Sequence, residues 1–367
     1  MKIRINTSQM KNFCRTVLLT GIFFFGVLVA YNSMNLAEEI KNKMIIVFLA
    51  SIVMFILNFK KGKHRNTYLI KCSYIFCLVV LLSSLGRADS TFMLAAILGA
   101  ASIFVMKKAF ESYNDNVYLS ICWAMFFAAI LALYRYSVSA FNSQGVIIAF
   151  FGIMLLNMLC IKRTKKISLF VVCVIVEIVL LALTKSRTSM LAFLVVAIIT
   201  YCYLFMQKVT VKNILIIFAG VCVLLVLHNY LEQFFVRIFF EKWGNTDITS
   251  SRTLIWGYIL QNRSILGHGV NHMNGGDAHN AFMQVLGVYG IPACIAFIIL
   301  IVSIFVKLAK CKYRIIYLNL FVGWLIVAMF ENLDIFSSRM IPVTILFLMH
   351  IVMLNNENSW TKKENNL

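Results

Sequence analysis

The polar residues best suited to chemistry lie between positions 184 and 280. The stretch 184–187 (TKSR) separates two long apolar runs, and Arg252 opens a further apolar run over 252–260. The helix dipole favours acids in a first turn, so an arginine at such a position suggests another use. Arginines bind phosphate oxygens bidentately and keep their charge. We therefore expect Arg187 and Arg252 to hold an anion, since neither has an evident acidic partner in the sequence. The alternative for Arg252 is a solvated surface side chain.

His279 is the candidate base. It follows a glycine-rich stretch over 267–276 and stands in the first turn of an apolar helix, which we expect Asp277 to cap. A helix start disfavours positive charge, so the imidazole stays neutral and can accept a proton. The alternative is a histidine that only hydrogen-bonds within the fold. An unbroken helix over 278–306 would be about 43 Å long, which exceeds the roughly 30 Å hydrocarbon core. We expect a break at Gly290-Ile291-Pro292.

Other residues of this region have weaker signals. The supporting candidates are Asn280, Arg135, Arg263 and His272. Glu331, Asp334 and Arg339 mark the last turn on the same face, and Glu177 lies halfway along an apolar span, where it pairs or hydrogen-bonds.

Metal chemistry is not expected. The spacing of His268, His272 and His279 across a glycine-rich loop matches no zinc pattern. The ten cysteines are scattered singly, most of them in apolar runs, with no CxxC pair. We expect neither a metal nor a cofactor, and we interpret the cysteines as small packing residues.

The composition excludes a soluble protein. Of 367 residues, 61% are hydrophobic and 13% are charged, whereas soluble domains have about 45–50% and about 25%. Long continuous apolar runs are also unlike a β-barrel or a disordered chain. The sequence predicts an all-α, polytopic integral membrane protein. The formal charge of +20 indicates cytoplasmic anchoring charges and an anionic substrate rather than nucleic acid.

We expect about twelve transmembrane helices in a single membrane domain over 1–367. The apolar runs lie near 14–34, 44–59, 68–86, 91–106, 117–134, 145–161, 167–184, 187–206, 211–228, 287–308, 314–331 and 340–355. One long connection, 229–286, separates the ninth and tenth spans. Within it we expect an interfacial helix over 229–243, or an extension of the preceding span, and a short buried helix over 252–260.

Basic residues orient these spans. If the N-terminus is cytoplasmic, every cytoplasmic connection is basic, for example 60–71 and 162–166. A shift by one span would destroy this pattern, which is typical of cytoplasmic loops. We expect both termini in the cytoplasm and the loop 229–286, with Arg187 close to it, on the outer face. The chain has no ATP-binding P-loop.

Three segments resemble the O-antigen polymerase and O-antigen ligase family of bacterial envelope glycosyltransferases. They are LTKSR at 183–187, SRTLIW at 251–256 followed by GHG at 267–269, and His279-Asn280 with Gly290. The resemblance covers about 183–293 in detail, whereas the first six predicted spans resemble the family only in their hydropathy.

The resemblance implies a metal-independent glycosyltransferase of the bacterial cytoplasmic (inner) membrane. Its donor would be an oligosaccharide on undecaprenyl diphosphate, with Arg187 and Arg252 on the diphosphate and His279 as the general base in a single inverting displacement. The implied partners are this lipid-linked oligosaccharide, the bilayer, a chain-length regulator and a flippase, with no nucleic acid.

The product class has more than one interpretation. Ala293 stands where the ligase pattern has Gly, Thr or Tyr. We therefore favour a polymerase that joins repeat units into O-antigen (lipopolysaccharide) or capsular polysaccharide. A ligase that transfers lipid-linked polysaccharide to another glycolipid is the alternative. A lipid-linked saccharide transporter would show internal repeats and charges near the midplane, whereas these candidates gather at one face; a structural scaffold is the last alternative.

Overall fold

The computed structural model describes residues 7–32, 36–58, 67–109, 115–136, 142–164, 166–205, 252–269, 278–311, 314–336 and 341–356. Across these ranges the regular secondary structure is helical, with no strand, and the expected all-α class is confirmed. The helices are α1 (Thr7–Asn32), α2 (Leu36–Asn58), α3 (Tyr68–Gly86), α4 (Ser90–Ala109), α5 (Asp115–Tyr136), α6 (Asn142–Ile161), α7 (Ile167–Thr184), α8 (Arg187–Phe205), α11 (Arg252–Gln261), α12 (Ala281–Tyr289), α13 (Ile291–Leu308), α14 (Arg314–Ala328) and α15 (Ile341–Asn356).

Seven helices of the described ranges are long and apolar enough to span a membrane. Shorter apolar stretches occur in α5, α14 and α15. Helices occupy the predicted span positions except 211–228, which lies outside the described residues, as does the expected helix at 229–243. The protein is therefore a multi-pass membrane protein, while the count of twelve and the full extent of the loop 229–286 stay predictions.

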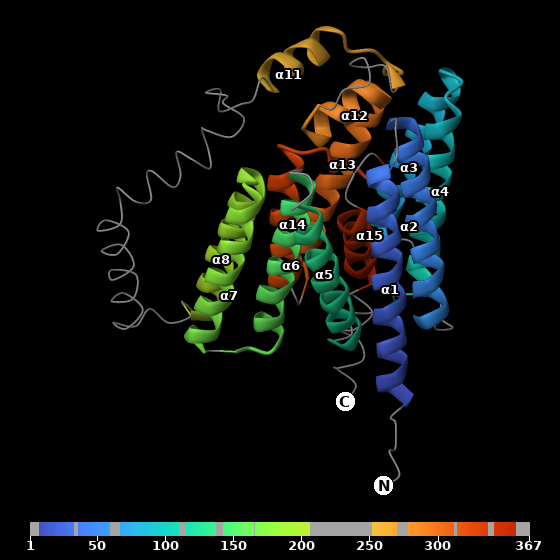
Figure 1. Ribbon diagram of the computed structural model, residues 1–367. Coiled ribbons are helices and arrows are strands. Elements are labelled where there is room, and N and C mark those ends of the chain that lie inside the picture. Colours follow the sequence, from blue (N-terminus) through green and yellow to red (C-terminus); the bar gives the residue numbers. More distant parts are fainter. Residues whose placement is uncertain are drawn as a thin grey trace.

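The long helices run side by side, with α11 and α12 gathered at one end, here called the site end (Figure 1). At the opposite end, two polar contacts show which helix ends lie next to each other. The Thr67 hydroxyl, just before α3, donates to the Asn355 side chain near the end of α15. Asn157 Nδ2, near the end of α6, donates to the Ile316 carbonyl at the start of α14. The chain therefore returns to the site end after α3 and after α14.

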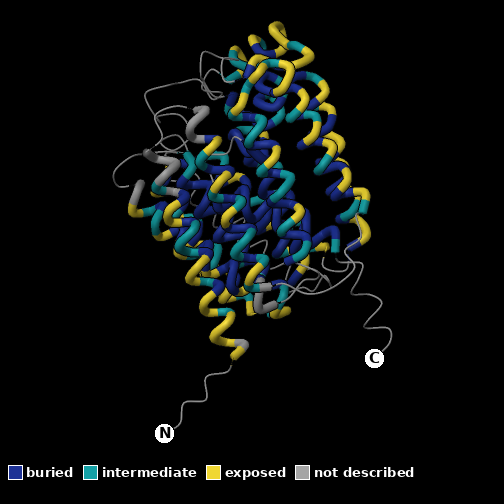
Figure 2. The backbone as a smooth tube through the Cα atoms, turned by 90° about the vertical axis from the view of Figure 1, so that its right-hand side faces the viewer, coloured by how far each residue is buried: buried dark blue, intermediate teal, exposed yellow. Residues whose placement is uncertain are grey.

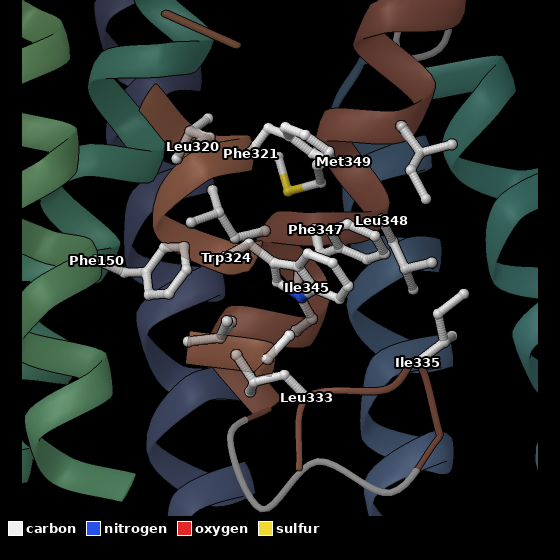
Figure 3. Packing of buried hydrophobic residues seen from close by; sticks show 14 of the residues in the cluster. Phe150, Leu320, Phe321, Trp324, Leu333, Ile335, Ile345, Phe347, Leu348 and Met349 are labelled. Carbon is white, nitrogen blue, oxygen red and sulfur yellow. The ribbon is translucent and has the colours of Figure 1, made fainter. Parts of the chain in front are cut away.

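Burial separates central helices from peripheral ones (Figure 2). All side chains from 341 to 355 in α15 are buried, as expected for a helix that is apolar all round. The Trp324 ring of α14 stacks on Phe347 of α15 at 4.4 Å between ring centroids, inside the cluster of Figure 3. In contrast, α7 buries only Phe170, Glu177, Leu181 and Thr184 within the described structure. The centre of the fold is thus α14 and α15, and α7 lies at the periphery of the described helices.

The expected break at Gly290 is confirmed. Gly290 separates α12 from α13 and has φ 89° and ψ −178°, which other residues rarely adopt. A Cβ at Gly290 would lie 2.0 Å from the Ile265 carbonyl oxygen, and a Cβ at Gly267 would lie 2.4 Å from the Val288 carbonyl oxygen. The loop that follows α11 therefore crosses the break in direct backbone contact.

Two hydrogen bonds hold this crossing. The His268 amide donates to the Gly287 carbonyl at 2.8 Å, and the Ile291 amide donates to the Ser264 carbonyl at 3.1 Å. The helix expected at 252–260 is present as α11, but its expected burial is wrong. Leu254 is 76% exposed and Ile259 is the buried residue of this helix. Among the described helices α11 packs mainly on α12 at the end of the bundle, so little of its surface is covered.

We predict that Gly290→Ala sharply lowers the yield of folded protein and its Tm, because the left-handed conformation and the Ile265 carbonyl both exclude a side chain. Gly257→Ala is the matched control, since a Cβ there meets no atom within 4 Å. In a helix this control is neutral or stabilises by up to about 1 kcal/mol. Thermal unfolding in detergent measures both, and equal Tm values for the two variants would contradict the tight crossing.

Candidate active site

Glu331 joins three separate segments at the site end. Its side chain is 7% exposed, and its Oε1 accepts a hydrogen bond from Asn142 Nδ2 at 3.0 Å, at the start of α6. The same oxygen lies 3.3 Å from Arg252 Nη2, at the start of α11. The second oxygen, Oε2, lies 3.6 Å from His279 Nδ1. One buried carboxylate thus brings the candidate base and a candidate anion-binding arginine together.

The turn after α14 holds this carboxylate in place. The Glu331 amide donates to the Val327 carbonyl at 2.7 Å, and the Glu331 carbonyl accepts from the Leu333 amide at 3.0 Å. Leu333 and Ile335 are buried, and both side chains lie in the packed cluster of Figure 3. The acid is therefore attached to a rigid part of the core.

Arg187 is placed by the tight turn between α7 and α8. Lys185 ends α7 in the left-handed conformation, at φ 51°. The hydroxyls of Ser186 and Ser189 lie 2.7 Å apart. A Cβ at Gly145 of α6 would lie 2.3 Å from Ser186 Cβ, so α6 packs directly on this turn. The geometry of the turn explains why Ser and Arg begin α8 at this point.

The charges of Arg187 and Arg252 act on each other. The positive charge of Arg252 disfavours that of Arg187. The Arg252 side chain is only 15% exposed, and Glu331 offsets its charge. The expectation that neither arginine has an acidic partner is wrong for Arg252. Its partner lies 79 residues away in the sequence, and only tertiary packing brings the two together.

Asn280, rather than Asp277, caps the helix that follows His279. The Asn280 side-chain oxygen accepts from the amides of Phe282 and Met283 at 2.9 and 3.0 Å. An asparagine is a strong N-cap because it satisfies amides that lack a helical partner. The expected cap, Asp277, lies outside the described residues, and α12 begins at Ala281 rather than at 278. His279 therefore precedes the helix, in a left-handed conformation at φ 48°.

The same asparagine fixes His279 relative to Glu331. Asn280 Nδ2 donates to the Met329 carbonyl at 2.9 Å, two residues before the acid. Trp256 Nε1 donates to the Ala278 carbonyl at 2.9 Å, which ties α11 to the residue before His279. The side chain of His279 is 40% exposed, so the imidazole also reaches outward from the cluster.

The other sequence candidates are not brought into this cluster. Arg263 is exposed, and its Nη1 donates to the Leu260 carbonyl at 2.7 Å, in the preceding turn. Arg135 lies in the last turn of α5, but its side chain is outside the described residues, as is His272. Within the described ranges no group of three His, Cys, Asp or Glu residues is arranged to hold a metal ion.

This arrangement suits the transfer of a proton beside an anionic group. A carboxylate next to Nδ1 orients an imidazole and leaves Nε2 as its basic nitrogen. The distance of 3.6 Å is longer than a hydrogen bond, as is common before substrate tightens such contacts. Arg252, on the same carboxylate, can bind a group that carries negative charge beside this base.

The fold is that of a polytopic membrane protein, and the cluster brings a candidate base and a candidate anion-binding arginine together at one end. Residues 172–298 match the family model described as O-antigen ligase. The match includes Arg187, Arg252 and His279 and ends before Glu331. It supports the O-antigen polymerase and ligase family, so the resemblance in the three motifs is confirmed. No curated protein matches the chain.

The matched segment is thus similar to a family described as O-antigen ligase, and the helices are those of a multi-pass membrane protein. Sequence reasoning placed Glu331 on the correct turn but assigned it no role, and it did not single out Asn142. A usable signal was present: the chain has only 14 acidic residues. An acid at the end of an apolar helix, on the face that carries Arg187 and Arg252, is a strong candidate partner.

We predict that Glu331→Gln lowers the Tm at low ionic strength, because Arg252 loses its carboxylate partner and the positive charge of the site rises by one. Part of the loss should be recovered in about 0.5 M salt, which screens exposed charges strongly, or with added pyrophosphate. Thermal unfolding across a salt series measures this. A Tm deficit that is independent of salt and pyrophosphate would show that Glu331 acts through packing and not through charge.

Proposed function

We propose that this protein polymerises undecaprenyl-diphosphate-linked oligosaccharide repeat units into O-antigen or capsular polysaccharide at the outer face of the cytoplasmic membrane. The observation that carries the proposal is the shared carboxylate of Glu331, with Arg252 on one oxygen and His279 beside the other. The nearby charge of Arg187 supports it.

In the proposed reaction, a hydroxyl of the acceptor saccharide attacks the anomeric carbon of the donor. The bond from that carbon to the diphosphate oxygen breaks as the new glycosidic bond forms, and the configuration inverts. His279 Nε2 takes the hydroxyl proton, a step that typically contributes about 10²–10⁴ in rate. Arg187 and Arg252 stabilise the charge that develops on the leaving diphosphate. Glu331 stabilises the imidazolium that forms.

The orientation is part of the proposal. The described basic residues at the end opposite the site include Lys11, Arg15, Lys71, Lys107, Lys108, Lys162, Arg163, Lys166, Lys307, Lys310 and Arg314. Such a cluster is typical of the cytoplasmic face. The site end, the loop 229–286 and the diphosphate would then lie outside, and both termini would lie in the cytoplasm.

Cysteine labelling tests this orientation. In a cysteine-free version, we expect a single cysteine at Ser90 to react with an impermeant maleimide added outside intact cells. A single cysteine at Lys162, exposed at the opposite end, should react only after the membrane is opened. The reverse pattern would place the site on the cytoplasmic face.

We predict that Arg187→Ala and Arg252→Ala each abolish product while the protein stays in the membrane. Lysine at either position should restore only part of the activity, because an ammonium cannot reproduce the bidentate guanidinium. Transfer from a defined lipid-linked oligosaccharide measures the effect, with Lys162→Ala as the control that removes a charge at the opposite end. Full activity in either alanine variant would remove that arginine from the site.

We predict that His279→Ala still binds the donor but loses transfer, since the arginines remain and the base does not. Wild-type activity should fall as the pH is lowered from about 8 to about 5, because a protonated imidazole cannot accept the hydroxyl proton. In Glu331→Gln, assayed in stabilising salt, this fall should move to lower pH, because the imidazole loses the carboxylate that favours its protonated form. A flat pH profile, or normal turnover by His279→Ala, would contradict the assigned base.

A ligase is the second candidate, because the matching family model is described as O-antigen ligase. The same base and the same leaving group serve both reactions, so the acceptor distinguishes them. Growth of repeat units on undecaprenyl diphosphate defines a polymerase, and transfer to a different glycolipid defines a ligase. Movement of intact donor across the bilayer without a new bond would instead define a transporter.

A further inference from the structure

The turn between α3 and α4 is rigid and faces the loop that follows α11. The Asp89 amide donates to the Ser84 carbonyl at 2.9 Å and the Ala88 amide to the Leu85 carbonyl at 3.0 Å. Together with the left-handed Ala88, at φ 56°, these bonds close the end of α3 in a Schellman motif. Asp89 Oδ1 also caps α4, since it accepts from the amides of Thr91 and Phe92.

Three contacts join this turn to the loop. Arg87 Nη1 donates to the Leu266 carbonyl. The Leu266 side chain covers Gly86, where a Cβ would lie 2.9 Å from Leu266 Cδ1. Gly269, at φ 61°, approaches so closely that a Cβ would lie 3.0 Å from Asp89 Oδ2 and 3.4 Å from Arg87 Nε. The loop 262–269 therefore lies between the Arg87 turn on one side and the Gly290 break on the other.

This loop leads toward the site in both chain directions. On its N-terminal side it continues α11, which begins at Arg252, and on its C-terminal side the chain leads to Ala278 and His279. The bond from Trp256 to the Ala278 carbonyl links the two sides again. A displacement of the loop would therefore move Arg252 and His279 relative to Glu331, which is attached separately to the core.

The side chain of Arg87 is partly buried, which costs free energy for a charged residue at the end of a helix. Its Nε and Nη2 atoms are buried and have no hydrogen-bond partner among the described residues. Burying an arginine without satisfying it costs free energy. Two interactions offset part of this cost: the nearby carboxylate of Asp89 and the hydrogen bond that Arg87 donates to the backbone of the loop.

We propose that Arg87 is a positioning residue, which holds the loop 262–269 against the α3–α4 turn so that Arg252 and His279 stay aligned on Glu331. The effect of Arg87 on catalysis rests on the proposed function. With this role, residues that shape the site also come from 67–109, a part of the chain outside the family match at 172–298.

Hydrogen–deuterium exchange and transfer rates test this together, in the full chain in nanodiscs. Arg87→Ala should speed exchange in peptides covering 262–269 and 278–289, and above all at the His268 amide that bonds Gly287. It should lower kcat by about tenfold or more, because displacements near 1 Å cost up to about 10². Arg87→Lys should recover part of both, since an ammonium still reaches a carbonyl. Ser90→Ala, an exposed change in the same region, should change neither.

Each outcome decides the proposal. Faster exchange confined to these peptides, lower kcat and partial rescue by lysine support it. Unchanged exchange in Arg87→Ala, or faster exchange with unchanged kcat, overturns it. Exchange that rises equally throughout the helices also overturns it, because Arg87 would then serve general stability. If the wild type itself transfers no saccharide, the proposed function fails, and the exchange data alone then decide whether Arg87 holds the Arg252 and His279 segments.

Discussion

The carboxylate of Glu331 is the interaction on which the site depends. A carboxylate that is 7% exposed at the end of an apolar bundle costs free energy unless donors and cations surround it. Asn142 and Arg252 meet one of its oxygens, and His279 lies beside the other. These residues come from three segments that share no local structure. The requirement to satisfy one acid therefore fixes where α6, α11 and the start of α12 lie relative to α14.

Backbone constraints do the rest of the positioning. The spacing between Asn280 and Gly290 is that of a single nine-residue helix, α12, capped at its start by the asparagine side chain and ended by the left-handed glycine. The family motif that contains these residues thus encodes a helix of defined length with His279 just before it. Gly267 and Gly290 let two backbones cross without side chains between them, and that crossing sets how the loop after α11 approaches the break.

Local patterns in the sequence were sufficient for the features that depend on nearby residues. Apolar runs predicted the positions of the helices, and the length of the stretch 278–306 predicted the break at Gly290. The same local patterns gave the wrong cap for α12. Asn and Asp are both good N-cap residues, and the structure uses Asn280 where the sequence suggested Asp277. Local patterns also failed for α11, because an apolar run does not tell whether a short helix has a neighbour to cover it.

The features that sequence could not supply are contacts between distant segments. Arg252 and Glu331 are 79 residues apart and Asn142 and Glu331 are 189 apart, and neither separation follows from periodicity. The sequence shows the positive charge of the site and places Glu331 on the same face, but it does not show that Glu331 contacts Arg252 and lies beside His279. The same holds for the Arg87 turn, whose contact with Leu266 spans 179 residues.

The central claim is that this site forms glycosidic bonds between lipid-linked repeat units. The most direct measurement is incubation of the purified protein with a defined undecaprenyl-diphosphate oligosaccharide, followed by size analysis of the products and determination of the anomeric configuration of each new linkage. The account predicts a ladder of repeat units that stay attached to undecaprenyl diphosphate, with inverted configuration at every new bond. Donor that remains a single repeat unit, or new linkages that retain the donor configuration, would contradict it.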